Sequence, residues 1–123
     1  MAKRHYKSFG EAFREKRIGK GFSLRKFAQL VGISPTYLSQ VEQGNVDPPT
    51  ADRVKRMAEL LHENPDEWIA LAGRVPDDLP AIIQEKIEVP DLLRAVQGLT
   101  AEQLRRLREN AERMQKEKKS KER

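Results

Sequence analysis

The chain has 123 residues, 35% charged and 37% hydrophobic, a length that accommodates one compact domain with an extension. It contains no cysteine, which excludes disulfides and thiolate metal sites, and its two histidines, His5 and His62, have no metal-ligand spacing around them. No apolar run approaches the roughly 18 residues that span a bilayer, and the first residues lack the apolar core of a signal peptide. We therefore expect a soluble, cytoplasmic protein with no metal, no cofactor and no membrane contact.

Positive charge is concentrated at the start of the chain. The net charge is +5, and residues 1–26 hold nine Lys and Arg against two Glu, a local net charge of +7. The rest of the chain is therefore close to neutral. A basic end on a near-neutral body is typical of a protein that binds a polyanion. The alternative is a solvated basic helix without such a partner.

The first predicted helix covers residues 8–20. Phe9 and Phe13 lie four residues apart on one face, Ser8 stands at the N-cap position, and glycines follow the last turn. A second helix begins after Ser23, another capping residue. Its apolar stripe consists of Leu24, Phe27, Ala28 and Val31.

The third predicted helix follows after a sharp bend at Gly32, where a left-handed backbone costs little without a Cβ. Ser34 can cap this helix and Pro35 stands at its first position, where no backbone donor is needed. Ile33 can pack on Leu38 as a hydrophobic staple. The inward face then holds Leu38 and Val41, and Gly44 ends the helix.

Two more helices complete a small core. Thr50 is expected to cap the fourth helix, and Asn64 followed by a proline and two acids predicts the start of the fifth. Gly73 ends it. Residues 8–73 are therefore expected to form one five-helix domain. Its inward residues after the third helix are Val54, Met57, Ala58, Leu61, Trp68, Ile69 and Leu71.

The pattern of apolar and polar residues changes after Gly73. A linker leads to two short apolar pieces, 81–87 and 91–96, which Pro90 is expected to separate. Thr100 and Gln103 then form a capping-box pattern before a helix with a heptad-like seam. We expect residues 74–118 to be a helical extension that dimerises or docks a partner, and residues 119–123 to be a disordered basic tail. The apolar seam of the last helix is Leu104, Leu107, Ala111 and Met114.

Residues 23–44 read as two short helices joined by a tight turn, the pattern of a helix-turn-helix. In the second helix of this pair, which is the third predicted helix of the chain, the apolar residues face inward and polar side chains remain on the outer side. A globular core does not need them there, but the major groove of DNA does, because base edges display donors, acceptors and thymine methyl groups. The pattern therefore predicts a DNA-reading helix.

Residues 9–61, and above all the stretch KRIGKGFSLRKFAQLVGISPTYLSQVEQGNVDPPT, resemble the Xre/Cro/C1 family of helix-turn-helix regulators, the lambdoid phage repressor type. The resemblance implies an all-α fold: a five-helix lambda-repressor-like DNA-binding domain with a helical C-terminal extension. It also implies a structural ion pair between Arg17 in the first helix and Glu42 near the end of the recognition helix.

The resemblance assigns roles to two sets of residues. Pro35 stands where lambdoid repressors often have glutamine, so readout is expected to rest more on Thr36, Gln40 and DNA shape. Tyr37 either flanks the bases or covers the edge of the core. The expected base-reading residues are Pro35, Thr36, Tyr37, Ser39 and Gln40, and the expected phosphate-contacting residues are Ser23, Leu24, Arg25, Lys26, Gln43, Asn45 and Arg53.

These features predict a sequence-specific transcriptional regulator of bacterial or phage origin, associated with the nucleoid. We expect a repressor that binds double-stranded DNA at an inverted repeat as a homodimer. The alternative is an antitoxin or phage-type regulator whose residues 74–118 dock a toxin or protease. No constellation of residues supports an enzyme, and no catalytic residue is expected.

Overall fold

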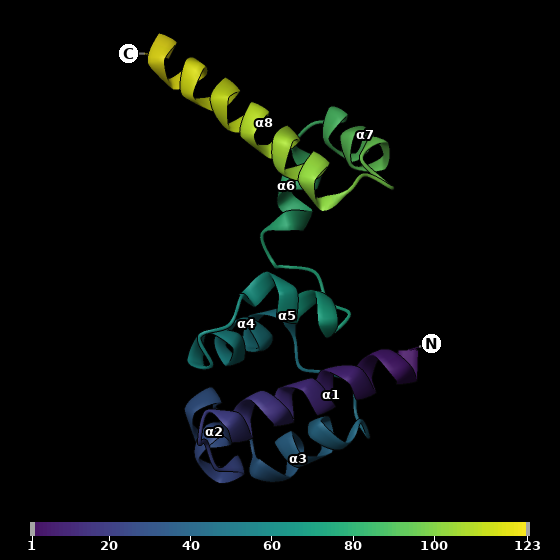
Figure 1. Cartoon of the computed structure of the whole chain (residues 1–123), viewed down its shortest axis with the longest axis vertical. Coiled ribbons are helices and arrows are strands. Elements are labelled where there is room, and N and C mark those ends of the chain that lie inside the picture. The colour runs from purple at the N-terminus through teal and green to yellow at the C-terminus, as the bar shows by residue number, and fades with distance from the viewer. Residues whose placement is uncertain (1, 123) are drawn as a thin grey trace. The chain divides into compact units, whose positions relative to one another are not determined.

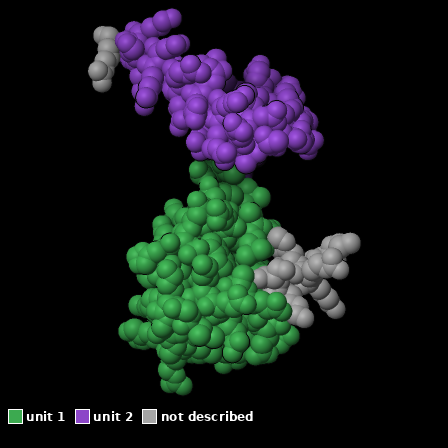
Figure 2. All heavy atoms as spheres, viewed as in Figure 1, with its two compact units in different colours: residues 1–79 green, residues 80–123 purple. Residues whose placement is uncertain are grey.

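The computed structural model describes residues 2–122 and, among them, the side chains of residues 9–122. This part of the chain is all helical and contains no strand, which confirms the predicted fold class. The chain divides into two compact units, Met1–Leu79 and Pro80–Arg123 (Figure 2). The helices are α1 (Ala2–Gly19), α2 (Leu24–Val31), α3 (Pro35–Gln43), α4 (Ala51–Leu60), α5 (Pro65–Leu71), α6 (Leu79–Glu85), α7 (Glu88–Ala95) and α8 (Ala101–Glu122).

The predicted caps largely explain where these helices begin. The side-chain oxygens of Ser23 and Ser34 each accept a backbone N–H from the first turn of α2 and α3, both at 3.0 Å. Asn64 does the same for α5 at 3.1 Å. Thr50 holds the N-cap position of α4, but its side chain accepts no capping hydrogen bond, so the prediction of a side-chain cap at Thr50 is wrong.

The first helix begins earlier than the sequence predicts. It starts at Ala2 rather than at residue 8, so Ser8 lies inside α1 and is not its N-cap. The residues before Ser8 include no glycine or proline, so nothing in the backbone interrupts the helix there.

The core of the first unit is built around an aromatic chain that links α1, α2 and α5. The ring centroids of Phe9 and Phe13 are 6.2 Å apart, and Trp68 meets Phe9 edge-on at 6.0 Å. Phe27 meets Phe13 edge-on at 5.0 Å, and Phe22, which the sequence did not single out, meets Phe27 at 5.3 Å. The other buried apolar residues are Ala28, Ile33, Leu38, Val41, Ala51, Val54, Met57, Ala58, Leu61, Ile69 and Ala72.

Helix α1 crosses α3 at Gly10, and the two helices lie together in Figure 1. A Cβ on Gly10 would stand 2.7 Å from the backbone oxygen of Glu42 and closer still to that of Val41. Only a residue without a side chain lets the backbones approach this closely. The position of α3 on the domain therefore depends on Gly10.

The second unit contains α7, α8 and nearly all of α6, and none of its described residues is buried. Pro90 does not separate the two short helices as expected. The break falls at Lys86 and Ile87, and Pro90 lies in the first turn of α7, where no backbone donor is required. The capping box before α8 is confirmed, because the backbone N–H of Gln103 donates to Thr100 Oγ1 at 3.1 Å and that of Thr100 donates to Gln103 Oε1 at 2.9 Å.

Helix α8 continues through Glu122, whereas the sequence predicts disorder from residue 119. Lysine and glutamate are good helix formers and prolong a helix that has already begun.

Candidate nucleic-acid interface

Helices α2 and α3 form the predicted helix-turn-helix. Gly32 ends α2 with a left-handed backbone at φ 84°, and the N–H groups of Gly32 and Ile33 both donate to the carbonyl oxygen of Ala28, at 2.9 and 3.0 Å. This bend turns the chain sharply into α3. Leu38 and Val41 are buried beneath α3, so its opposite face is directed away from the core.

The expected base-reading residues all lie on α3. Pro35 and Thr36 in its first turn are exposed, and Ser39 and Gln40 in its second turn are half-buried. Tyr37 is also half-buried and packs against the core, which agrees with the second of the two roles that the sequence left open for it. All five residues keep some exposed surface, and base reading by them stays a prediction.

The polar side chains at the end of α3 bind one another. Asn45 Nδ2 donates to Gln40 Oε1 at 2.9 Å and to Gln43 Oε1 at 3.2 Å. Gln43 Nε2 in turn donates to Ser39 Oγ at 3.0 Å. The sequence predicts Ser39, Gln40 and Gln43 on the outer side of the helix or at its ends and a phosphate contact for Asn45, but it does not predict a network among the four.

The expected phosphate-contacting residues come from three elements. The Ser23 hydroxyl caps α2, so its oxygen is already engaged with the backbone of Lys26. Arg25 and Lys26 are exposed in the first turn of α2, and Arg53 is exposed on α4. Leu24 is half-buried and takes part in the core packing, so only its backbone remains for a phosphate contact.

A buried ion pair connects α1 to the end of α3. Arg17 and Glu42 are each only 7% exposed. Arg17 Nε donates to Glu42 Oε2 at 2.7 Å and its Nη2 donates to Glu42 Oε1 at 3.0 Å, while Nη1 donates to the carbonyl of Phe22 at 2.8 Å. The structure thus contains the pair that the resemblance implied.

Two arginines for which the sequence predicts no role donate hydrogen bonds to backbone carbonyls near the helix-turn-helix. Arg56 on α4 donates from Nε at 3.2 Å and from Nη2 at 3.1 Å to the carbonyl of Leu30, at the negative end of α2. Arg74, expected in a linker, donates to the carbonyls of Pro48 and, at 3.1 Å, Pro49. Both partners are backbone oxygens distant in sequence, so no sequence motif signals these contacts.

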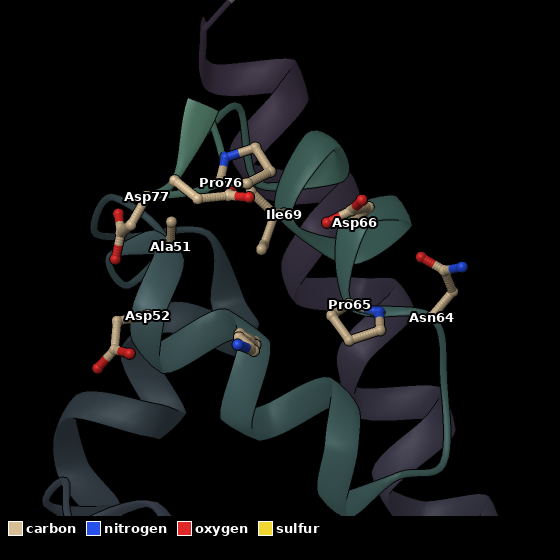
Figure 3. Close-up of a pocket in the computed structure, with 10 residues that line it drawn as sticks. Ala51, Asp52, Asn64, Pro65, Asp66, Ile69, Pro76 and Asp77 are labelled. Carbon is tan, nitrogen blue, oxygen red and sulfur yellow. The ribbon is translucent and has the colours of Figure 1, made fainter. Parts of the chain in front are cut away.

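A hollow of about 450 Å³ lies elsewhere on the first unit, between α4, α5 and the segment that follows α5 (Figure 3). Asp52 and Asp77 lie on one side of it and Asp66 on another. Carboxylates repel phosphates, so this hollow does not extend the interface. Among the described residues, no cluster of His, Cys, Asp or Glu is arranged to hold a metal ion, and no helix is long and apolar enough to cross a membrane.

The fold and this surface define a helix-turn-helix DNA-binding protein. Residues 13–68 match the model of the helix-turn-helix family HTH_3, the Xre/Cro/C1 type that the sequence indicated. The protein is accordingly a DNA-binding transcriptional regulator. No curated protein sequence matches the chain.

Several solved structures are similar to part of this chain. The clp gene regulator ClgR from C. glutamicum is 26% identical, with 56% of this chain and 87% of that chain covered and a TM-score of 0.49. The restriction-modification controller protein C.AhdI from Aeromonas hydrophila is 29% identical, with 54% of this chain and 94% of that chain covered and a TM-score of 0.49. An HTH_3 family transcriptional regulator from Vibrio cholerae is 26% identical, with 57% of this chain and 39% of that chain covered and a TM-score of 0.49.

Proposed function

We propose that the protein is a repressor that binds an inverted-repeat operator as a homodimer, with α3 of each copy in the major groove. The observation that carries the proposal is the outer face of α3, which presents polar side chains while Leu38, Val41 and the Arg17–Glu42 pair hold the helix from behind. A helix fixed in this way can enter a groove without losing its place on the domain.

Base reading is assigned to the exposed and half-buried residues of α3. Gln40 can pair through its amide with adenine, and the methyl group of Thr36 can contact a thymine methyl. Pro35 and Ser39 flank them. Pro35 offers no hydrogen bond, so part of the specificity comes from DNA shape.

Phosphate contacts are assigned to the start of α2 and its neighbourhood. The free backbone N–H groups of a helix N-terminus bind phosphate, and Arg25 and Lys26 add two exposed cations in the same turn. Arg53 on α4 adds a third. These contacts set the register of the protein on the duplex and carry no sequence information.

The homodimer rests on the second unit. Seven of its large apolar side chains are between 42% and 76% exposed, and none of its described residues is buried. Exposed apolar surface of this extent marks an interaction site, and a second copy covers it while doubling the number of base pairs read. The side chains concerned are Ile82, Ile87, Leu92, Leu93, Leu104, Leu107 and Met114.

The test combines a genome-wide binding footprint with sedimentation of the full chain at micromolar concentration. The proposal expects a two-fold symmetric footprint with half-site centres about 34 Å apart, one turn of DNA, and a dimer in solution. Footprints without an inverted repeat would contradict it.

The same apolar surface supports a second function. A toxin or protease that docks on residues 74–118 would cover these side chains equally well, as in an antitoxin or phage-type regulator. A chain that sediments as a monomer, both free and bound to DNA, would favour this alternative over the homodimer.

A further inference from the structure

The side chain of Asn45 is placed by the end of α3 and is not free to swing. Gly44 adopts a left-handed backbone at φ 75°, and the backbone N–H of Asn45 donates to the carbonyl of Gln40 at 3.0 Å. This turn brings the Asn45 carboxamide back beside the helix. Both hydrogens of Nδ2 are then used, one on Gln40 Oε1 and one on Gln43 Oε1.

The contact with Asn45 fixes which way round the Gln40 amide lies. If that amide turned over while Asn45 kept its bond to Gln43 Oε1, its NH₂ group would face the NH₂ group of Asn45, and two donors cannot bond. Gln40 Oε1 is therefore held toward Asn45. Gln40 Nε2 donates to no other residue in the described part of the chain, so its hydrogens remain available to a partner.

We propose that Asn45 is a positioning residue that determines specificity, because it orients Gln40 to read adenine in preference to guanine at one base pair of each half-site. The inference rests on the proposed function, in which α3 lies in the major groove. The oriented amide donates from Nε2 to a purine N7, and the second lone pair of Oε1 accepts from adenine N6. Guanine presents the acceptor O6 at that place, which Oε1 repels.

This role replaces the phosphate contact that the sequence suggested for Asn45. The backbone N–H and both Nδ2 hydrogens of Asn45 are used within the protein. Its side chain then has only the oxygen Oδ1 left, an acceptor that a phosphate oxygen repels.

The experiment selects bound DNA from a pool of synthetic duplexes with a randomised central segment, using the full-length chain. Wild type is run beside Asn45→Ala and Gln40→Ala, with Gln29→Ala, an exposed glutamine of α2 outside this hydrogen-bond network, as the matched control. For wild type and Gln29→Ala we expect about tenfold more adenine than guanine at one position of each half-site. We expect this preference for adenine to fall below about twofold in Asn45→Ala and in Gln40→Ala. A variant that carries both substitutions should lose no further preference.

Two further measurements separate positioning from other roles. Binding to random DNA and the dependence of affinity on salt should be unchanged in Asn45→Ala, because no phosphate contact is lost. Its melting temperature should match that of wild type, since the Asn45 side chain is exposed.

Three outcomes would overturn the inference. If Gln40→Ala relaxes one position and Asn45→Ala leaves it unchanged, Asn45 does not orient Gln40, and the proposed function still stands. If Asn45→Ala weakens binding to all duplexes and lowers the salt dependence, Asn45 contacts phosphate. If wild type enriches no sequence at all, the proposed function fails together with this inference.

Discussion

The guanidinium of Arg17 on α1 grips both carboxylate oxygens of Glu42 in the last turn of α3. The pair is nearly inaccessible to water, and a third donor of Arg17 binds the carbonyl of Phe22 in the turn before α2. One side chain thus connects the first helix, the entry to the helix-turn-helix and the end of the helix assigned to base reading.

Arg17→Met should destabilise the protein by about 3–5 kcal/mol, because Glu42 would remain buried without its partner. Chemical denaturation monitored by circular dichroism measures this loss. The double variant with Glu42→Leu should recover most of it, since no unpaired charge is then left. The control is Arg14→Ala, whose side chain is 62% exposed and 3.9 Å from Glu42, and which should cost less than about 0.5 kcal/mol. An unchanged stability in Arg17→Met would show that water screens the pair.

Gly10→Ala should destabilise the domain by about 1–3 kcal/mol, although alanine favours helices, because the new Cβ would collide with backbone oxygens of α3. Thermal melting gives the change. Gly19→Ala, also in α1, is the matched control: nothing lies within 4 Å of the added Cβ, so it should be neutral or stabilising. Equal melting temperatures for the two variants would contradict the close crossing of α1 and α3.

Gln40→Ala should weaken binding to the cognate site by about 1–3 kcal/mol and leave binding to random DNA almost unchanged, because only the cognate site offers the matching base. Fluorescence anisotropy with both duplexes measures the two affinities. A ratio of cognate to random affinity equal to that of wild type would mean that another element reads the bases.

Lys26→Ala should weaken binding to all duplexes alike and reduce the slope of log affinity against log salt by about 0.9, the value for one phosphate contact. The Lys26 backbone N–H that binds Ser23 is retained in this variant, so α2 keeps its cap. Titrations at several salt concentrations provide the slopes. A wild-type slope near zero would be incompatible with DNA binding through these cations.

Leu107→Glu should convert the proposed dimer to a monomer and reduce affinity for a full inverted repeat, while binding to a single half-site stays as in wild type. Leu107 is 44% exposed and belongs to a unit without buried residues, so a charge there does not disturb a core of the monomer. Sedimentation equilibrium gives the assembly state. If the variant still sediments as a dimer, the interface lies outside the seam of α8.

Much of this protein follows from local rules that operate within a few residues. Helix starts at Ser23, Ser34, Asn64 and Thr100 were predicted, since a capping side chain needs only a backbone N–H two or three positions away. The buried face of each helix in the first unit follows from the spacing of its apolar residues. These rules, with the resemblance, also sufficed for the helix-turn-helix and the surface that α3 presents.

Other features depend on atoms that are distant in sequence, and only the tertiary structure decided them. The close approach at Gly10 and the contacts of Arg56 and Arg74 with backbone carbonyls each need a partner that folding brings into place. A glycine inside a helix and an arginine in a linker have no distinctive spacing. Their roles arise because the backbone of another segment comes into contact with them once the core has packed.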